Sequence, residues 1–322
     1  MNPFWTAAAA LALDRAMGDP AWLPHPVVAM GRWIGWLEGR WNRRDRSDGV
    51  RRALGAVVVV TTLAWAGGLT FGLLWLAGRV SPALAAALNV VLTATTVAWR
   101  GLRDAGRAVY RRLREEGLDA ARCEVARYVG RDTAHLPEPE VVRAAVETVA
   151  ENLVDAVVSP LFFACLLGAP GAMMYRAANT LDSMLGHRDR RFRAFGWSAA
   201  RLDDVLNFIP ARLTAGIVVI ALAFRGLPAL RALQVMRRDA GGHPSPNAGI
   251  PEAMMAGGLG VQLGGWNVYH GVPSFRALMG DPLRTLEAAD IPRAVAVLDT
   301  ACAVTGVLLA ALGCAVRWGG GW

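Results

Sequence analysis

No charged side chain interrupts residues 53–77, ALGAVVVVTTLAWAGGLTFGLLWLA, or residues 82–99, PALAAALNVVLTATTVAW. A helix needs about 20 apolar residues to cross the hydrocarbon core of a bilayer, and both stretches match that requirement. Only a short turn at residues 78–82 separates them. The two stretches therefore predict a transmembrane helical hairpin.

Four more apolar segments lie before and after this hairpin in the sequence. Residues 294–316 form a strong segment with one aspartate, and residues 3–18 form a shorter one. Two others are broken, residues 153–175 by prolines and glycines and residues 205–224 by a proline and an arginine. We therefore predict an all-α, polytopic integral membrane protein with four to six spanning helices, re-entrant or broken segments and a single membrane-embedded domain over residues 1–322.

The arginine distribution predicts the orientation of the hairpin. Six arginines lie in residues 40–52 and six in residues 100–114, against Arg79 alone in the turn between the two stretches. Positive residues favour the cytoplasmic side, so both flanks are expected inside and the turn outside. The later loops also carry arginines, which favours re-entrant or interfacial broken segments, as buried non-helical backbone permits. The alternative has six spans, with residues 176–204 outside.

The basic residues are all arginine. The chain has 34 basic residues against 26 acidic ones, a net charge of +8, and contains no lysine. A Schiff base, a lysine nucleophile and a P-loop of the GxxxxGK[ST] type are therefore excluded. The four cysteines are far apart and form no CxxC pair, so neither a zinc site nor a disulfide framework is expected.

The most informative polar segment is VVRAAVETVAENLVD, residues 141–155. Glu147, Glu151 and Asp155 stand at i, i+4 and i+8 of a predicted helix, so they share one face, and Arg143 precedes them by one turn. We call these three acids the carboxylate row. Carboxylates in a row repel one another unless a partner neutralises them, and a divalent cation such as Mg²⁺ is a natural partner. The alternative is a solvated helix face paired with arginines from elsewhere.

Two turns offer further polar groups. His25, in Pro24-His25-Pro26, is a candidate base or substrate contact, or a residue that holds the turn. Residues 130–133, GRDT, place backbone amides beside the guanidinium of Arg131 and the carboxylate of Asp132, which suits a phosphate or a bound cation.

Polar residues recur along the rest of the chain, several of them spaced to share a helix face. The glycines between residues 257 and 265 are compatible with close approach to a large ligand or with tight helix packing. The remaining candidates for substrate binding are Arg143, Asn152, Arg176, Asn179, Asp182, Arg201, Asp203, Asp204, Asn207, Arg212, His243, Asn247 and Glu252.

Six motifs occur in one order along the chain. They are DRAMGDP with PHPV from residue 14, YVGRDT from 128, RAAVETVAENLVD from 143, NTLDSMLG from 179, ARLDDVLNFIPARLTA from 200 and HPSPNAGIPEAMMAGGLGVQLGG from 243. In this combination the chain resembles the adenosylcobinamide-phosphate synthases, the CbiB/CobD family of cobalamin biosynthesis, over roughly residues 11–290.

The resemblance implies a membrane synthase. It would join the propionate carboxylate of adenosylcobyric acid to the amine of (R)-1-aminopropan-2-ol or its O-phosphate, in an ATP-dependent amide ligation that gives adenosylcobinamide or its phosphate. An acyl phosphate would supply the leaving group, which requires Mg²⁺ on the nucleotide and positive charge near the transferred group. We expect the catalytic residues to be Glu147, Glu151, Asp155 and Asp132, with Mg²⁺ on at least one of the row, and the arginines to bind substrate.

The resemblance also implies a location and partners. We expect the inner cell membrane, with active-site loops facing the cytoplasm, ATP and Mg²⁺ as co-substrate and ion, and no tightly bound prosthetic group. Membrane lipid and other late cobalamin-pathway membrane enzymes are expected partners, and nucleic acid is not. Two alternatives stay open: a transporter for a corrinoid or another amphipathic anion, because broken apolar segments are also typical of transporters, and a non-catalytic membrane sensor.

Overall fold

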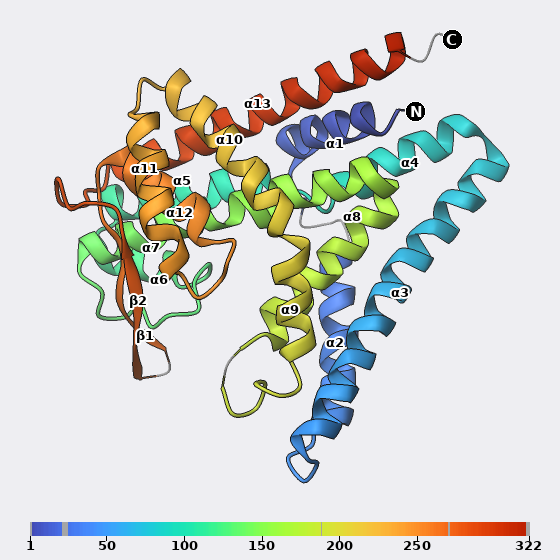
Figure 1. Ribbon diagram of the computed structural model, residues 1–322, viewed down its shortest axis with the longest axis horizontal. Coiled ribbons are helices and arrows are strands. Elements are labelled where there is room, and N and C mark those ends of the chain that lie inside the picture. Colours follow the sequence, from blue (N-terminus) through green and yellow to red (C-terminus); the bar gives the residue numbers. More distant parts are fainter. Residues whose placement is uncertain (1, 21–24, 188, 270, 320–322) are drawn as a thin grey trace. The chain divides into compact units, whose positions relative to one another are not determined.

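The computed structural model describes residues 2–20, 25–187, 189–269 and 271–319, and they are mostly helical (Figure 1). Four helical stretches are long and apolar enough to cross a membrane, or five if one bent pair counts as a span. This confirms the prediction of an all-α polytopic membrane protein. One β-hairpin, which the sequence did not predict, is the only strand pairing among these residues.

The chain forms two compact units, each built from separate stretches of sequence. The first unit comprises Met1–Ala98, Ser159–Asn207 and Gly306–Trp322. Its helices are α1 (Pro3–Met17), α2 (Pro26–Trp41), α3 (Asp48–Val80), α4 (Pro82–Ala94), α8 (Ser159–Leu185) and α9 (Trp197–Leu206). The expectation of one synthase domain over the whole chain stays a prediction.

The second unit comprises Trp99–Val158 and Phe208–Thr305. Its elements are α5 (Trp99–Glu115), α6 (Leu118–Val125), α7 (Glu138–Leu153), the π-helix η1 (Val154–Val158), α10 (Phe208–Phe224), α11 (Ala229–Asp239), the short 3₁₀ turn η2 (Ala240–Gly242), α12 (Gly249–Leu259), β1 (Leu263–Tyr269) and β2 (Val272–Met279). The last helix, α13 (Asp290–Gly319), contributes residues to both units.

The predicted hairpin corresponds to α3 and α4, which meet at Ser81 (Figure 1). The Ser81 side chain caps α4 by accepting a hydrogen bond from the backbone N–H of Leu84 at 3.0 Å. The strong segment 294–316 lies within α13, and α13 is also a spanning candidate. The segment 3–18 forms α1, whose 15 residues are fewer than a straight span needs.

Both segments predicted to be broken are interrupted in the structure. Residues 153–175 pass from α7 through η1 into α8, and α8 is itself kinked at Gly168, where φ is 66°. The kink leaves the backbone N–H of Ala169 without its partner in the helix. Asn89 of α4 provides another, since its Oδ1 accepts a hydrogen bond from this N–H at 2.8 Å. The segment 205–224 is divided between α9 and α10, which form the bent pair.

The first unit has a core in which α2, α3 and α8 pack together around Ile34, Val58 and Leu181. Gly55 on α3 is required for this packing. A Cβ atom at Gly55 would lie 1.9 Å from the carbonyl oxygen of Phe195, a distance that forces the backbone apart.

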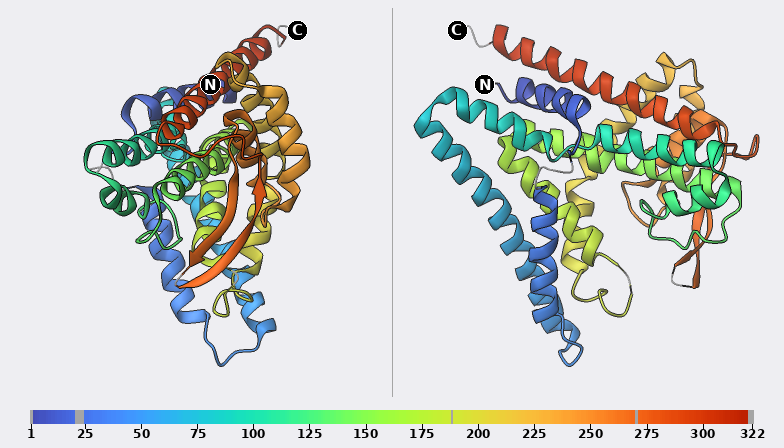
Figure 2. Two further views of the ribbon diagram at one scale, coloured as in Figure 1. Left: turned by 90° about the vertical axis from the view of Figure 1, so that its left-hand side faces the viewer. Right: turned by 180° about the vertical axis from the view of Figure 1, so that it is seen from behind.

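In the second unit α12 is the central helix. All eleven of its residues are buried, and it packs against α7, α10 and α11. The β1–β2 hairpin, the twisted ribbon in the left-hand view of Figure 2, is antiparallel and contacts α11 and α12. A polar side chain on α12 therefore points into the protein interior, which is the environment of Glu252.

Candidate functional site

The site in the second unit is built on α7. Its N-terminus carries Pro139 and the acidic Glu138 and Glu140, which suit the first turn of a helix because its free N–H groups are partly positive. The next turns bury their polar face, since Arg143 and Glu147 are 3% and 4% exposed. Buried charges at these positions must be paired, because an isolated charge in the interior is costly.

Glu147 is paired with two arginines. Its Oε2 accepts a hydrogen bond from Nη2 of Arg131 at 2.5 Å, and its Oε1 accepts one from Nη1 of Arg143 at 3.1 Å. The backbone N–H of Gly264 donates a third bond to Oε1 at 2.9 Å. Both carboxylate oxygens of Glu147 are therefore occupied by protein donors.

The β-hairpin completes this arrangement. Asn267 of β1 accepts hydrogen bonds through Oδ1 from both Arg131 and Arg143. We call Arg131, Arg143, Glu147 and Asn267 the arginine–carboxylate cluster. Gly264 supplies a backbone N–H to Glu147 and a carbonyl oxygen to Arg143.

Gly264 and Asn267 were not predicted as site residues, and only the glycine-rich run 257–265 marked this region. Gly264 has a φ of +82°, and a Cβ atom there would lie 2.2 Å from the carbonyl oxygen of Ala277. Only glycine adopts this positive φ without strain and also leaves room for the carbonyl oxygen of Ala277. The glycine therefore brings the hairpin backbone close to α7, which is neither of the two roles considered for this run.

Asp132 also contacts the hairpin. Its backbone N–H donates to the carbonyl oxygen of Val268 at 2.8 Å, and its Oδ2 accepts a bond from the N–H of Gly271 at 2.8 Å. The GRDT turn thus connects the β-hairpin to α7, because Arg131 bonds to Glu147 and to β1, and Asp132 bonds to β1 and to the turn that follows it. A role of Asp132 in catalysis stays a prediction.

The carboxylate row is not one continuous α-helical face. Glu147 and Glu151 lie on α7, but Asp155 lies in η1, where the helix widens to a π-helix. A π-helix changes the rotation per residue, so the i, i+8 alignment assumed for Asp155 does not hold. Glu151 differs from Glu147, because no hydrogen bond or ion pair to Glu151 is found among the residues that the structure describes.

Glu252 and His243 form a second buried pair in the same unit. Glu252 is fully buried and His243 Nε2 lies 3.6 Å from its Oε1, too far for a hydrogen bond. Neither oxygen of Glu252, nor Nε2 of His243, has a hydrogen-bond partner in the described part of the chain. Nδ1 of His243 lies 3.0 Å from the backbone N of Ser245 and 3.2 Å from its carbonyl oxygen, so this ring nitrogen is fixed by the Ser245 backbone.

Electrostatics in this region favours neutral forms of both groups. Burial, together with the charges of Glu151 and Glu147, raises the pKa of Glu252 well above its usual range. Burial and the nearby charge of Arg276 lower the pKa of His243 to about 4. Arg276, on β2, was not among the predicted site residues. The three acids on α7 and α12 therefore share one electrostatic environment with Arg131 and Arg276.

Across residues 2–20, 25–187, 189–269 and 271–319, no group of three or more His, Cys, Asp or Glu side chains is arranged to hold a metal ion. The oxygens of Glu147 already accept bonds from arginine, so Glu147 is a poor ligand. Mg²⁺ at Glu151 or Asp155 stays a prediction.

A separate polar cluster lies in the first unit, around Asn207. Its Oδ1 accepts hydrogen bonds from Ser159 Oγ at 2.6 Å and from Tyr175 OH at 2.8 Å. Its Nδ2 donates to Asp203 Oδ2 at 2.9 Å, as the predicted spacing of four residues allows. The charge of Asp182 also acts on Asp203. The structure thus brings Asp182, Asp203 and Asn207 together in this unit.

Other predicted residues make local contacts. Arg176 donates to Asn179 at 3.3 Å, and Arg201 forms a surface ion pair with Asp204 at 3.2 Å. His25 caps α2, since its Nδ1 accepts the N–H of Val27 at 3.2 Å. This contact agrees with the turn-holding alternative.

The last predicted residues belong to the second unit. Arg212 of α10 donates to Oδ1 of Asn247 at 2.9 Å, which joins two candidate substrate residues, and Asn247 is buried. Asn152 donates to the carbonyl oxygen of Thr148 one turn before it, at 2.9 Å. Asn152 therefore bonds neighbouring backbone, and its role in substrate binding stays a prediction.

Comparisons with known proteins agree over nearly the whole chain. The family described as CobD/Cbib protein matches residues 7–298. A protein of Halalkalibacterium halodurans named cobalamin biosynthesis protein CobD is 43% identical over 294 residues, 90% of either chain. A Geobacter metallireducens protein of the same name is 45% identical over 282 residues, 87% of either chain.

A protein of Salmonella typhimurium named cobalamin biosynthesis protein CbiB is 40% identical over 302 residues, 94% of this chain and 95% of its own. No solved structure matches this chain.

Proposed function

Since the chain belongs to the CobD/CbiB family of cobalamin biosynthesis proteins, we propose that it is the synthase that forms an amide on a corrinoid side chain. The carboxylate of adenosylcobyric acid would be joined to the amine of (R)-1-aminopropan-2-ol or its O-phosphate. ATP would phosphorylate the carboxylate with release of ADP, and the amine would then displace phosphate from the acyl carbon.

The observation that carries this proposal is the buried carboxyl group of Glu252. Two buried carboxyl oxygens without hydrogen-bond partners are costly, and a cationic ligand that donates N–H groups would offset that cost and favour the ionised form of Glu252, which burial alone disfavours. The ammonium group of the amino alcohol has three such donors. We therefore assign Glu252 the role of binding this ammonium group.

Glu252 is also suited to take a proton. An ammonium group has no lone pair for attack until it loses one proton, and a carboxylate whose pKa is raised accepts a proton more readily than an ordinary one. The first proton would move from the ammonium nitrogen to Glu252, and the nitrogen would then bond to the acyl carbon. The phosphate would leave with the electrons of the broken C–O bond and take up the second proton from the nitrogen, which leaves the neutral amide. Neutral His243 lies 3.6 Å from the carboxyl group and does not bond to it, so both oxygens of Glu252 stay open to the ligand.

The positive groups of the site suit the phosphorylated intermediate. Arg276 and Arg131 act electrostatically on Glu252, so an anionic group bound beside Glu252 would lie in a positive field. Arg131 is held by Glu147 and Asn267, which fixes its orientation. Glu147 is then a positioning residue, because it acts through arginine.

Mg²⁺ fits Glu151 better than Glu147, because the carboxylate of Glu151 is not used by donors in the described part of the chain. Mg²⁺ in nucleotide sites is commonly held by one or two carboxylates plus the substrate phosphates. When bound, the ion would neutralise charge on the transferred phosphoryl group. In this proposal Glu151 holds the ion and the nucleotide phosphates supply other ligands.

The test uses purified protein in detergent with adenosylcobyric acid, Mg-ATP and either form of the amino alcohol. Formation of the amide with equal amounts of ADP and phosphate is expected. Glu252→Gln should abolish product while the protein still folds, and Glu138→Gln, an exposed acid on the same helix as Glu151, is the matched control. Corrinoid binding without turnover in the wild type would instead favour the transporter or the sensor.

A further inference from the structure

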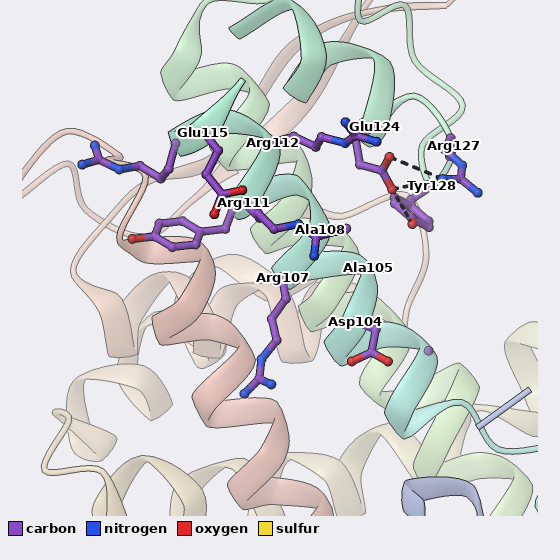
Figure 3. Close-up of a pocket in the computed structure, with 13 residues that line it drawn as sticks. Asp104, Ala105, Arg107, Ala108, Arg111, Arg112, Glu115, Glu124, Arg127 and Tyr128 are labelled. Atoms are coloured by element: carbon purple, nitrogen blue, oxygen red, sulfur yellow. Dashed lines mark hydrogen bonds and ion pairs between the residues drawn. The ribbon is translucent and has the colours of Figure 1, made fainter. Parts of the chain in front are cut away.

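A surface pocket of about 810 Å³ lies on α5 and α6 of the second unit (Figure 3). Its size is within the range of pockets that hold small molecules. Arginine dominates its lining, with three acids and two tyrosines among the other residues. The five arginines are Arg107, Arg111, Arg112, Arg114 and Arg127.

Two of the three acids in the lining, Glu124 and Asp104, already have partners. Glu124 bonds to Tyr128 at 2.8 Å and pairs with Arg127 at 3.3 Å, the contacts drawn as dashed lines in Figure 3. Asp104 pairs with Arg100 at 3.5 Å, outside the pocket lining. With five arginines and three acids, the lining keeps a net charge of +2.

Two of the arginines are available for a ligand. Arg111 and Arg114 are exposed, and no hydrogen bond or ion pair to either is found among the described residues. Arg107 approaches an acid at 3.9 Å, at Asp299. Guanidinium groups without acidic partners on one face of a helix are suited to bind an anion with several oxygens.

The pocket is distinct from the proposed catalytic face of α7. The small hollow next to it shares Ala105 and Tyr128 with the pocket and is lined by Ala145, Thr148 and Val149 of α7. At 100° per residue, these α7 positions lie about 100–160° around the helix from Glu147. The charged pocket therefore does not extend the site around Glu147.

We propose that this pocket binds a phosphate-bearing anion, and that the phosphate is the headgroup of an anionic phospholipid. Arginine clusters that follow a membrane span are suited to anionic lipid headgroups. One spanning candidate, Pro82–Glu115, contains both α4 and α5, and all of its arginines lie in α5, in its C-terminal half. The buried face of α5 is apolar, with Val109 and Leu113, and its arginines lie on the other face.

The experiment measures ligand binding by native mass spectrometry of the protein in detergent. The probes are phosphatidylglycerol, phosphatidylcholine, ATP and inorganic phosphate. The test variant is Arg111→Gln with Arg114→Gln, and the matched control is Arg237→Gln, an exposed arginine on α11. Both test positions are exposed, so the variant is expected to fold, and amide formation should be unchanged.

Wild-type protein should bind phosphatidylglycerol in preference to phosphatidylcholine, and the double variant should bind it about 10- to 100-fold more weakly, as expected for lost charge-assisted bonds. Weaker binding of ATP or inorganic phosphate instead, without any preference for phosphatidylglycerol, would keep the anion site but overturn the lipid as its ligand. Equal binding of every probe by the double variant and the control would overturn the site itself. None of these outcomes depends on turnover.

Discussion

Replacing Glu147 by glutamine should destabilise the protein, although glutamine has almost the same shape. The charge of Glu147 neutralises Arg131 and Arg143, whose side chains are 5% and 4% exposed. Removing one partner of a buried ion pair typically costs about 3–5 kcal/mol, because the other charge stays buried without compensation. Arg143 keeps a second carboxylate, Glu140. We therefore expect the lower end of this range, about 3 kcal/mol.

The assay is unfolding of purified protein in mixed micelles with increasing sodium dodecyl sulfate, read by circular dichroism. Glu138→Gln is the control, because Glu138 is exposed on the same helix and surface changes usually stay within about 0.5 kcal/mol. A Glu147→Gln protein as stable as this control would refute the ion-pair role of Glu147. If that stable protein had also lost turnover, Glu147 would be a catalytic residue, as the sequence first suggested.

The remaining predictions concern the site, the hairpin and the topology. Glu151→Gln should retain wild-type stability and lose amide formation, because Glu151 has no protein partner among the described residues; near-normal turnover at saturating Mg²⁺ would remove it from the site. Gly264→Ala should destabilise by about 1–3 kcal/mol through backbone strain, measured by the same unfolding assay. The pKa of His243 is about 4 in the folded protein and 6.5 in the unfolded chain. Between pH 6.5 and 4 the unfolded chain therefore binds a proton that the folded protein does not, and the free energy of unfolding decreases as the pH falls through this range. His243→Gln should therefore flatten that part of the stability profile, a change of up to about 3 kcal/mol. Finally, an impermeant thiol reagent applied outside should label a cysteine at Val80 and spare one at Arg237, both exposed positions; the reverse pattern would invert the proposed orientation.

The helical architecture was predictable because apolar length is a strong signal. The uncharged stretches 53–77 and 82–99 became α3 and α4, and the proline- and glycine-rich segment 153–175 proved to be interrupted at η1 and Gly168. The hairpin at residues 263–279 was missed. Its pairing depends on glycines with positive φ and on contacts with α11 and α12, which are distant in sequence.

The site was only partly predictable. Spacing along a helix identified Glu147 and Glu151 as neighbours, but it could not show that Glu147 is paired with arginine from a distant loop. It also could not show that Asp155 falls in a π-helix, since local sequence does not specify that widening. Arg276 and Asn267 gave no signal of their own, because an arginine or an asparagine in a short strand is usually exposed.

The kink at Gly168 has a consequence for how the chain is made. A broken helix leaves backbone groups that lipid cannot bond, so α8 would enter a bilayer alone at a cost of several kcal/mol for each unpaired group. The partner for the N–H of Ala169 is Asn89, which is synthesised 80 residues earlier. The acceptor, Asn89, is therefore synthesised before the donor, Ala169. When α8 leaves the ribosome, α4 can already be inserted in the membrane. In this chain the order of synthesis matches the order in which the membrane segments need one another.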